Sequence, residues 1–203
     1  TKYRFTVLTE RLIRIEYNEY GEFNDSPTEL VWFRNMPKVK FEKNETDTVL
    51  EIKTSYFKLT YIKEKPFLGS KINPVSNLKI ELNSTKKQWY YRHPEVRNYG
   101  FPATSLDEND GKIKLRKGLY SIDGFSSIDD SKSNIMSKTG TLITRQNNEI
   151  DTYVFLYGKN FEGALKDYFR ITGVPALIPR YALGIWWSRT IPYSEDEINT
   201  LTE

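Results

Sequence analysis

The chain has 203 residues, a formal net charge of +3, and hydrophobic and aromatic fractions of 38% and 14%, enough to build a core and unlike a disordered chain. Its 30 basic and 27 acidic residues are well mixed, so no basic stripe indicates nucleic-acid binding, and no apolar run is long enough to span a membrane. The absence of cysteine excludes disulfides and Cys-based zinc sites, and it is typical of the cytoplasmic location that we expect.

From the N-terminus to about residue 158 the hydrophobic pattern has a period of two. Tyr3, Phe5 and Val7 alternate with polar residues, and 13–17 and 78–82 show the same alternation. Further strand candidates are residues 48–54, 57–62, 141–144 and 152–158. Turn-rich stretches at 18–27, 63–74 and 108–112 separate them. Many short strands with almost no helix predict a mainly β fold, an antiparallel β-sandwich.

The pattern changes at Asn160. In "FEGALKDYFRI", residues 161–171, the apolar positions recur at offsets of three, four, seven and eight, which places them on one face of a helix. Asn160 is of a type that caps a first helical turn, and Gly173 is of a type that ends a helix. We therefore predict a helix over about 161–171 at the end of an N-terminal sandwich domain, residues 1–174.

A second unit follows. The two prolines of "VPALIPR" predict a linker, "YALGIWW" (181–187) reads as a strand, and Ser194 and Glu197 have the spacing of a capping box at the start of a helix. A lone β-α unit cannot bury its own faces, because parallel strands need neighbours. Residues 175–203 are therefore predicted to be a linker and the first β-α unit of a truncated second domain.

Four segments together resemble glycoside hydrolase family 31, which contains α-glucosidases, α-xylosidases and related retaining enzymes. "GVPALIPRYALGIWWSR", followed by Tyr193 and "EDEI", is similar to the entry into the catalytic barrel of that family. Upstream, "GLYSIDGFSSIDDS" (118–131), "NYGFPATSLDENDG" (98–111) and "YRFTVLTERLIRIEY" (3–17) resemble stretches of its N-terminal domain, in the family's order. The resemblance covers nearly the whole chain.

The resemblance implies a sandwich of the galactose-mutarotase-like type that packs against a (β/α)₈ barrel. The family's two catalytic aspartates lie on later barrel strands, so this chain holds no catalytic residue and should be inert alone. Retaining enzymes need two carboxyl groups about 5–5.5 Å apart, and they need no metal and no cofactor. The implied function is that of an N-terminal fragment of a glycoside hydrolase that acts on α-linked glucosides or related sugars.

The resemblance also suggests substrate-binding residues. An acidic residue on an N-terminal loop can bind sugar in the family, and Asp107 is the candidate for that role, with Asp110 as its rival. Trp187, Arg189 and Thr190 come near the carboxyl end of the implied first barrel strand, where barrel active sites lie. Many relatives have an aromatic residue where this chain has Thr190, which points to a different sugar, linkage or bulk of substrate.

Other hypotheses remain open. A free-standing carbohydrate-binding sandwich is the main alternative, and the aromatic run of Trp89, Tyr90 and Tyr91 would serve it if it were exposed rather than part of a strand. A mutarotase-like enzyme would need histidine at a sugar site, and the one histidine, His93, precedes a proline in a predicted loop. An uncovered interdomain surface would also allow a homo-oligomer. No nucleic-acid or membrane partner is expected.

The acidic residues of 118–131 invite another interpretation. Asp123, Asp129 and Asp130 could be drawn as an acid/base pair, but closeness in sequence does not establish convergent geometry. Asp and Gly favour tight turns, and Asp side chains accept hydrogen bonds from nearby backbone N–H groups. We expect these three carboxylates to be structural.

Overall fold

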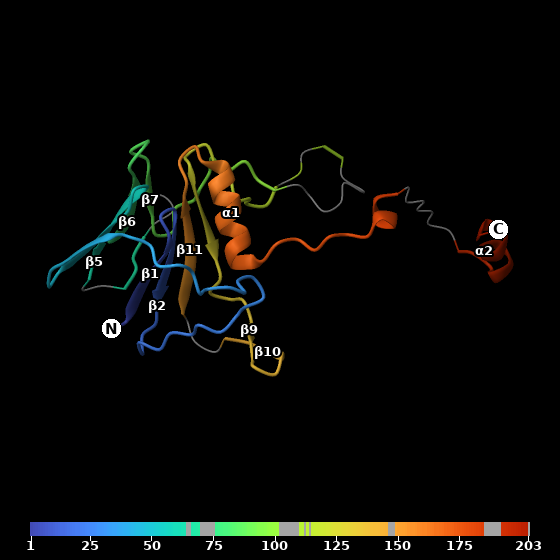
Figure 1. Cartoon of the computed structure of the whole chain (residues 1–203), viewed down its shortest axis with the longest axis horizontal. Coiled ribbons are helices and arrows are strands. Elements are labelled where there is room, and N and C mark those ends of the chain that lie inside the picture. Colours follow the sequence, from blue (N-terminus) through green and yellow to red (C-terminus); the bar gives the residue numbers. More distant parts are fainter. Residues whose placement is uncertain are drawn as a thin grey trace.

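The alternating stretches of the sequence form two antiparallel sheets in the computed structural model, which describes residues 1–63, 66–69, 76–101, 110–111, 113, 115–145, 149–184 and 192–202 (Figure 1). One sheet has the order β1 (Tyr3–Thr9), β2 (Leu12–Tyr17), β11 (Ile150–Leu156) and β8 (Phe125–Asp129). The other has the order β3 (Glu42–Glu45), β4 (Val49–Lys53), β5 (Phe57–Ile62), β6 (Leu78–Leu82) and β7 (Gln88–Tyr90). A small hairpin pairs β9 (Ile135–Met136) with β10 (Leu142–Ile143).

The main core lies between the two sheets. On β5 every second residue, Phe57, Leu59 and Tyr61, is fully buried, because successive strand residues point to opposite faces. From the opposite sheet Ile13 and Val154 belong to the same cluster of buried side chains. Two sheets that bury their apolar faces against each other form a sandwich, so the predicted mainly β, antiparallel β-sandwich is confirmed.

The helix α1 (Phe161–Thr172) covers the outer face of the four-stranded sheet (Figure 1). Ala164 and Ile171 are buried on its inner side, in one cluster with Tyr153 and Phe155 of β11. β11 is therefore apolar on both faces. The side chain of Asn160 accepts a hydrogen bond of 2.9 Å from the backbone N–H of Gly163, so the predicted cap is confirmed.

The strand β8 departs from the sequence prediction of turns around residues 122–131. Phe125–Asp129 pairs with β11 along its whole length. The sequence signal is weak because Ser126 and Ser127 occupy the middle of the strand, and Ser126 is buried only because its hydroxyl donates to the Leu119 carbonyl over 2.6 Å. The charged edge strand β3, whose residues are all exposed, is likewise not indicated by hydrophobic pattern.

After α1 the chain leaves the sandwich as an extended segment (Figure 1). It contains a short 3₁₀ helix, η1 (Arg180–Leu183), and beyond residues 185–191, which lie outside the described part, the helix α2 (Glu195–Thr202). The Ser194 backbone N–H donates to Glu197 over 2.8 Å, as a capping box does. The predicted strand 181–187 falls partly on η1 and partly outside the described residues, and the domain division at 174/175 stays a prediction.

Candidate functional site

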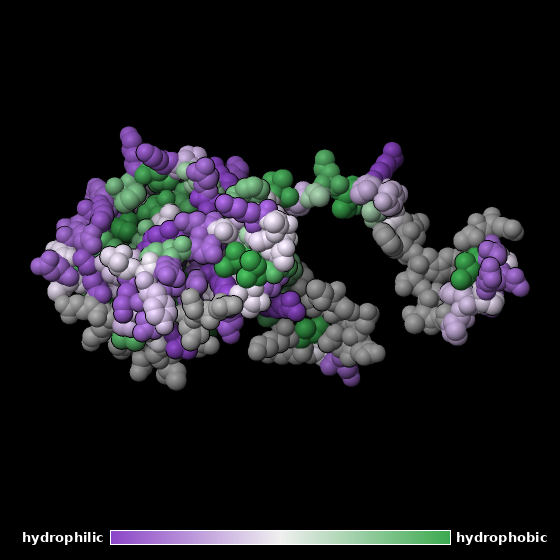
Figure 2. Space-filling view, turned by 90° about the horizontal axis from the view of Figure 1, so that it is seen from below, coloured by the Kyte–Doolittle hydropathy of each residue, from purple (hydrophilic) through white to green (hydrophobic). Residues whose placement is uncertain are grey.

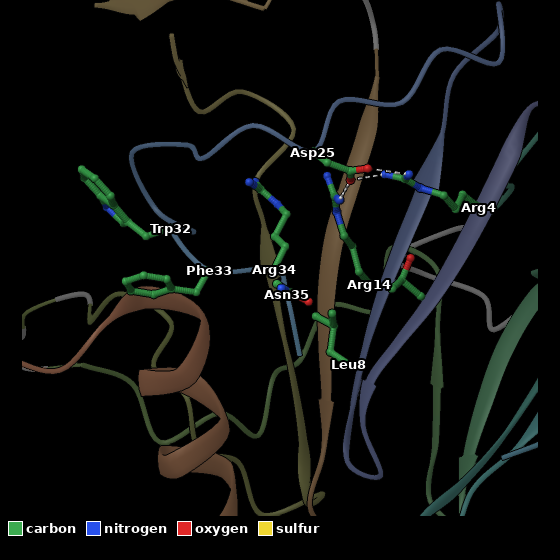
Figure 3. Close-up of a pocket in the computed structure, with 9 residues that line it drawn as sticks. Arg4, Leu8, Arg14, Asp25, Trp32, Phe33, Arg34 and Asn35 are labelled. Atoms are coloured by element: carbon green, nitrogen blue, oxygen red, sulfur yellow. Dashed lines mark hydrogen bonds and ion pairs between the residues drawn. The ribbon is translucent and has the colours of Figure 1, made fainter. Parts of the chain in front are cut away.

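A hollow of about 490 Å³ lies on the outer face of the four-stranded sheet (Figure 3). We call it the arginine hollow; it is lined by Arg4, Thr6, Leu8, Arg14, Asp25, Trp32, Phe33, Arg34 and Asn35. β1 contributes its even-numbered residues, which point away from the core, and β2 contributes Arg14. The remaining residues come from the long segment between β2 and β3.

Carboxylates neutralise the first two arginines of the hollow. Arg4 makes two hydrogen bonds with Glu16, of 2.7 and 2.8 Å, and Arg14 makes two with Asp151, of 2.8 Å each. Asp25 bridges the two guanidinium groups, which Figure 3 shows as dashed lines. The hydrogen bond from Arg4, with a further one from Arg14, holds the pKa of the Asp25 carboxyl below its usual value despite partial burial.

The guanidinium group of Arg34 is likewise fully hydrogen-bonded within the protein. Its Nε donates to the hydroxyl of Tyr153 over 2.8 Å, one terminal nitrogen donates to the Ser26 carbonyl, and the other lies 3.3 Å from a carboxylate oxygen of Asp130. Each guanidinium nitrogen of the three arginines thus already donates to a protein acceptor. The arginine side of the hollow therefore holds the long segment onto the sheet and is not built to receive an anion.

The other side of the hollow is apolar and open. Trp32 and Phe33 are 47% and 55% exposed, and their backbone N–H groups donate to the Ile171 carbonyl over 2.8 and 3.0 Å. Figure 3 shows Phe33 over the end of α1, with Trp32 beside it on the side away from Arg4. Two exposed aromatic side chains fixed to a helix end suit contact with an apolar surface or stacking on a sugar ring.

All four predicted substrate-binding residues fall outside the described part of the chain. They are Asp107, Trp187, Arg189 and Thr190. The structure therefore neither brings them together nor separates them, and they stay predictions. Asp110, the rival of Asp107, is described and is exposed.

His93 lies in the loop after β7, as the sequence predicts. Its ring makes edge contacts with Tyr90 and Phe125, with centroids 4.6 and 5.0 Å apart, and its Nδ1 accepts a hydrogen bond of 2.9 Å from the backbone N–H of Glu95. Burial lowers the pKa of the imidazole, only partly offset by the nearby carboxylates of Glu95 and Asp123. Trp89, in the strand before it, is buried in the core.

The three acidic residues of 118–131 have structural partners. Asp130 is fully buried and accepts from the Thr28 hydroxyl over 2.9 Å, and burial raises the pKa of its carboxyl. Asp123 accepts from Lys87 over 2.8 Å, and Asp129 accepts from the backbone N–H of Ser131 over 3.1 Å. Each of the three carboxylates thus accepts a hydrogen bond from a neighbouring protein group. Within the described ranges, no group of three His, Cys, Asp or Glu residues could hold a metal ion.

Sequence reasoning missed two sets of residues. The aromatic pair Trp32–Phe33 lies in the sequence "VWFRN". Two adjacent aromatic residues outside an alternating strand pattern could have indicated that one or both are exposed. Glu95 is buried although it follows a His-Pro turn, and nothing in the local pattern indicates that. In the described ranges, no helix is long and apolar enough to cross a membrane.

No protein-family model and no curated protein matches the chain. Two solved structures of the GH31 dextranase of Flavobacterium johnsoniae are similar to this chain. One is a mutant enzyme in complex with isomaltotriose, and the other is the enzyme in complex with glucose. Each has a TM-score of 0.44 and 14% sequence identity, over 91% of this chain and 27% of that chain. The chain thus spans about a quarter of the length of these structures.

Proposed function

We propose that the chain is the N-terminal β-sandwich of a retaining α-glycosidase, joined to the first β-α unit of the catalytic barrel. The order of the four motif segments supports this proposal, and so does the sandwich fold. One structural observation carries it furthest: two exposed apolar surfaces meet where α1 ends, as if both were to be covered by a further domain.

The first of these surfaces is the aromatic pair Trp32–Phe33. The second is the segment that leaves α1, whose exposed apolar side chains are Val174, Leu177, Ile178, Tyr181 and Leu183. Figure 2 shows the stretch that leads away from the sandwich as largely green. Burial of apolar surface lowers the free energy by about 25 cal/mol per Å². Exposed apolar side chains of this kind therefore favour a partner that covers them. The barrel that follows in the proposed full protein would be that partner.

In this proposal the sandwich itself performs no bond cleavage. The catalytic pair of carboxyl groups belongs to later barrel strands, about 5–5.5 Å apart, where one attacks the anomeric carbon and the other protonates the leaving oxygen. Asp107 would reach the substrate from a loop of the sandwich, and Trp187, Arg189 and Thr190 would lie on the first barrel strand. No metal or cofactor takes part.

The test is an assay of the complete gene product against the 203-residue chain, with an aryl α-glucoside and isomaltotriose as substrates. We expect the complete product to release the aryl group or glucose and the chain alone to release neither. Absence of hydrolysis by the complete product, or hydrolysis by the chain alone, would contradict the proposal. If the complete product hydrolyses, Asp107→Asn is expected to raise KM, whereas Asp47→Asn, an exposed control, is expected to leave it unchanged.

The exposed Trp32–Phe33 pair also suits the alternative function, a free-standing carbohydrate-binding sandwich. In that case the chain alone would bind gluco-oligosaccharides, Trp32→Ser would abolish the binding, and the complete product would hydrolyse nothing. The same pair could instead be covered by a second copy of the chain, which sedimentation of the chain alone would reveal. The cytoplasmic location stays an expectation from the sequence.

A further inference from the structure

The sandwich is open at the edge where β7 and β8, the last strands of their sheets, lie, and a pocket of about 500 Å³ occupies this edge. We call it the edge pocket. Its walls come from three strands: Trp89 of β7, Ser127 and Asp129 of β8, and Ile150 and Thr152 of β11. The volume falls in the range of small-molecule sites, roughly 300–1,000 Å³. The edge pocket therefore has room for a small ligand.

Polar side chains replace apolar ones on the inner face of β8 as the strand approaches this pocket. Phe125 belongs to the main core, and Ser127 and Asp129 follow on the same face because successive strand side chains alternate. In the register with β11, Asp129 lies opposite Thr152. Positions that face the inside of a sandwich ordinarily carry apolar side chains, so the three polar residues here leave the core unfilled and point to a role in binding.

One hydroxyl group in the wall of the edge pocket is available to a ligand. Thr152 is 7% exposed, and within the described ranges its hydroxyl makes no hydrogen bond. The neighbouring hydroxyls are occupied, because Ser127 donates to Glu95 and Ser131 donates to Asp129. Buried polar groups are nearly always hydrogen-bonded, so the Thr152 hydroxyl is set up to meet a group from outside the protein.

The mouth of the edge pocket is positively charged. Arg92, Lys117 and Lys132 line it, and all three are exposed. Asp129 is the one carboxylate among the described residues that line it. Lys117 lies 3.6 Å from the buried carboxylate of Glu95, so these two charges offset each other. Arg92 and Lys132 form neither an ion pair nor a side-chain hydrogen bond in the part of the chain that the structure describes. The pocket thus carries an excess of positive charge, which favours an anion.

The cations of the edge pocket differ from those of the arginine hollow in what they leave unused. In the hollow each guanidinium nitrogen already donates to a protein acceptor, whereas Arg92 and Lys132 keep their donors for a ligand. Asp129 accepts from the backbone N–H and the hydroxyl of Ser131, so its charge is stabilised by neutral groups and uses up neither cation. Its negative charge nevertheless opposes an anion in the pocket, and removal of that charge should strengthen binding.

We propose that the edge pocket binds the phosphate group of a small anion, either inorganic phosphate or a phosphate monoester, with Arg92, Lys132 and the Thr152 hydroxyl as its donors. Guanidinium, ammonium and hydroxyl groups are the side-chain donors from which phosphate oxygens accept hydrogen bonds in proteins. This inference goes beyond the proposed function and does not rest on it. Failure of the hydrolysis assay would leave it intact, and failure of binding here would leave the glycosidase proposal intact.

The experiment is a titration of the chain with inorganic phosphate, glucose 6-phosphate and D-glucose at about pH 7.5 and about 150 mM salt, where long-range attraction is screened. The readout is the NMR signal of the His93 ring, because His93 is the one histidine of the chain and lines the pocket. Lys132→Gln removes a positive charge from the pocket. Lys138→Gln is the matched control, because both lysines are exposed and neither forms an ion pair within the described ranges. Asp129→Asn and Thr152→Val keep the shape of their side chains and remove the negative charge and the hydroxyl, respectively.

We expect saturable binding of at least one of the two phosphate compounds, with a Kd of about 1–10 mM, and no binding of D-glucose. Tighter binding of glucose 6-phosphate assigns the site to a phosphate monoester, and equal or tighter binding of phosphate assigns it to the free ion. Lys132→Gln should weaken binding about threefold, as expected for an exposed charge pair, and Lys138→Gln by less than about 1.5-fold. Thr152→Val should also weaken binding, and Asp129→Asn should strengthen it about twofold.

The proposal would be overturned if neither phosphate compound saturated the His93 signal at about 50 mM, a concentration well above the expected Kd. Binding of D-glucose as tight as that of glucose 6-phosphate would overturn it too, because the phosphate group would then contribute nothing. Equal effects of Lys132→Gln and Lys138→Gln would mean that the net charge of the chain attracts the anion, and weaker binding by Asp129→Asn would mean that the pocket does not select an anion.

Discussion

Arg14 and Asp151 lie diagonally on the neighbouring strands β2 and β11 and are joined by two hydrogen bonds of 2.8 Å, with each side chain 2% exposed. Arg145 also donates a hydrogen bond of 2.9 Å to Asp151. The Asp151 carboxylate therefore joins β2 to the segment before β11 on the outer face of the four-stranded sheet. Burial by itself would raise the pKa of the Asp151 carboxyl, yet the hydrogen bonds and charges of Arg14 and Arg145 hold it below its usual value. The ionised form of Asp151 is thus part of the folded structure.

Asp151→Asn should therefore lower the free energy of unfolding by about 3 kcal/mol, the low end for breaking a buried ion pair, because Arg14 keeps its contacts with Glu16 and Asp25. Urea unfolding at pH 7, followed by tryptophan fluorescence, measures it. The control is Asp47→Asn, an exposed position expected to stay within about 0.5 kcal/mol of the original chain. Equal stabilities for the two variants would show that the Arg14–Asp151 pair contributes nothing net.

Stability should also fall as the pH is lowered through the range of His93. Because burial lowers its pKa in the folded state, the unfolded chain binds the proton more readily, so the free energy of unfolding is largest above about pH 6.5, the ordinary histidine value, and declines as the pH falls through and below it. His93→Gln, which retains an acceptor for the Glu95 N–H, should remove this decline. The chain has one histidine, so the difference between the two pH profiles isolates it. A decline that persists in the variant would assign the effect to carboxylates whose pKa is lowered in the folded state, such as Asp25 and Asp151.

The sequence predicted the parts of the fold that depend on hydrophobic period and missed those that depend on hydrogen bonds. β5 and β6 alternate strictly and were predicted within a residue or two, and the helix and its Asn160 cap followed from period and residue type. β8 was missed because two serines interrupt its hydrophobic pattern, and Ser126 is buried with its hydroxyl bonded to the Leu119 carbonyl. The hydrogen bond from the Glu95 backbone N–H to His93 was missed because Glu95 has a positive φ, a conformation that the residue type argues against.

Gly124 should be intolerant of any side chain. It has φ of 78°, and a Cβ there would lie 2.6 Å from the backbone of Gly158, so Gly124→Ala requires two chain segments to separate. Gly140 is the matched control, with φ of 83° and no atom within 4 Å of its added Cβ. Gly140→Ala should cost only the left-handed penalty, about 1–2 kcal/mol, and Gly124→Ala should cost at least twice as much. Thermal unfolding of both variants compares them, and equal losses would mean that the close approach of Gly124 to Gly158 is relaxed at little cost.

The exposed pair Trp32–Phe33 should govern the association of the chain. Replacing both by serine removes apolar surface at the end of α1 without touching the core, so the free energy of unfolding should change by less than about 1 kcal/mol. If Trp32 and Phe33 form an interface for another domain or copy, their exposed surface should cause the original chain to self-associate. The double variant should then remain monomeric at the same concentrations, as measured by light scattering. Phe41→Ser, which removes a similarly exposed aromatic residue before β3, is the control and should leave association unchanged. An equal effect of the two replacements would mean that general hydrophobicity drives association, and the argument for a covering domain at Trp32–Phe33 would lose its main support.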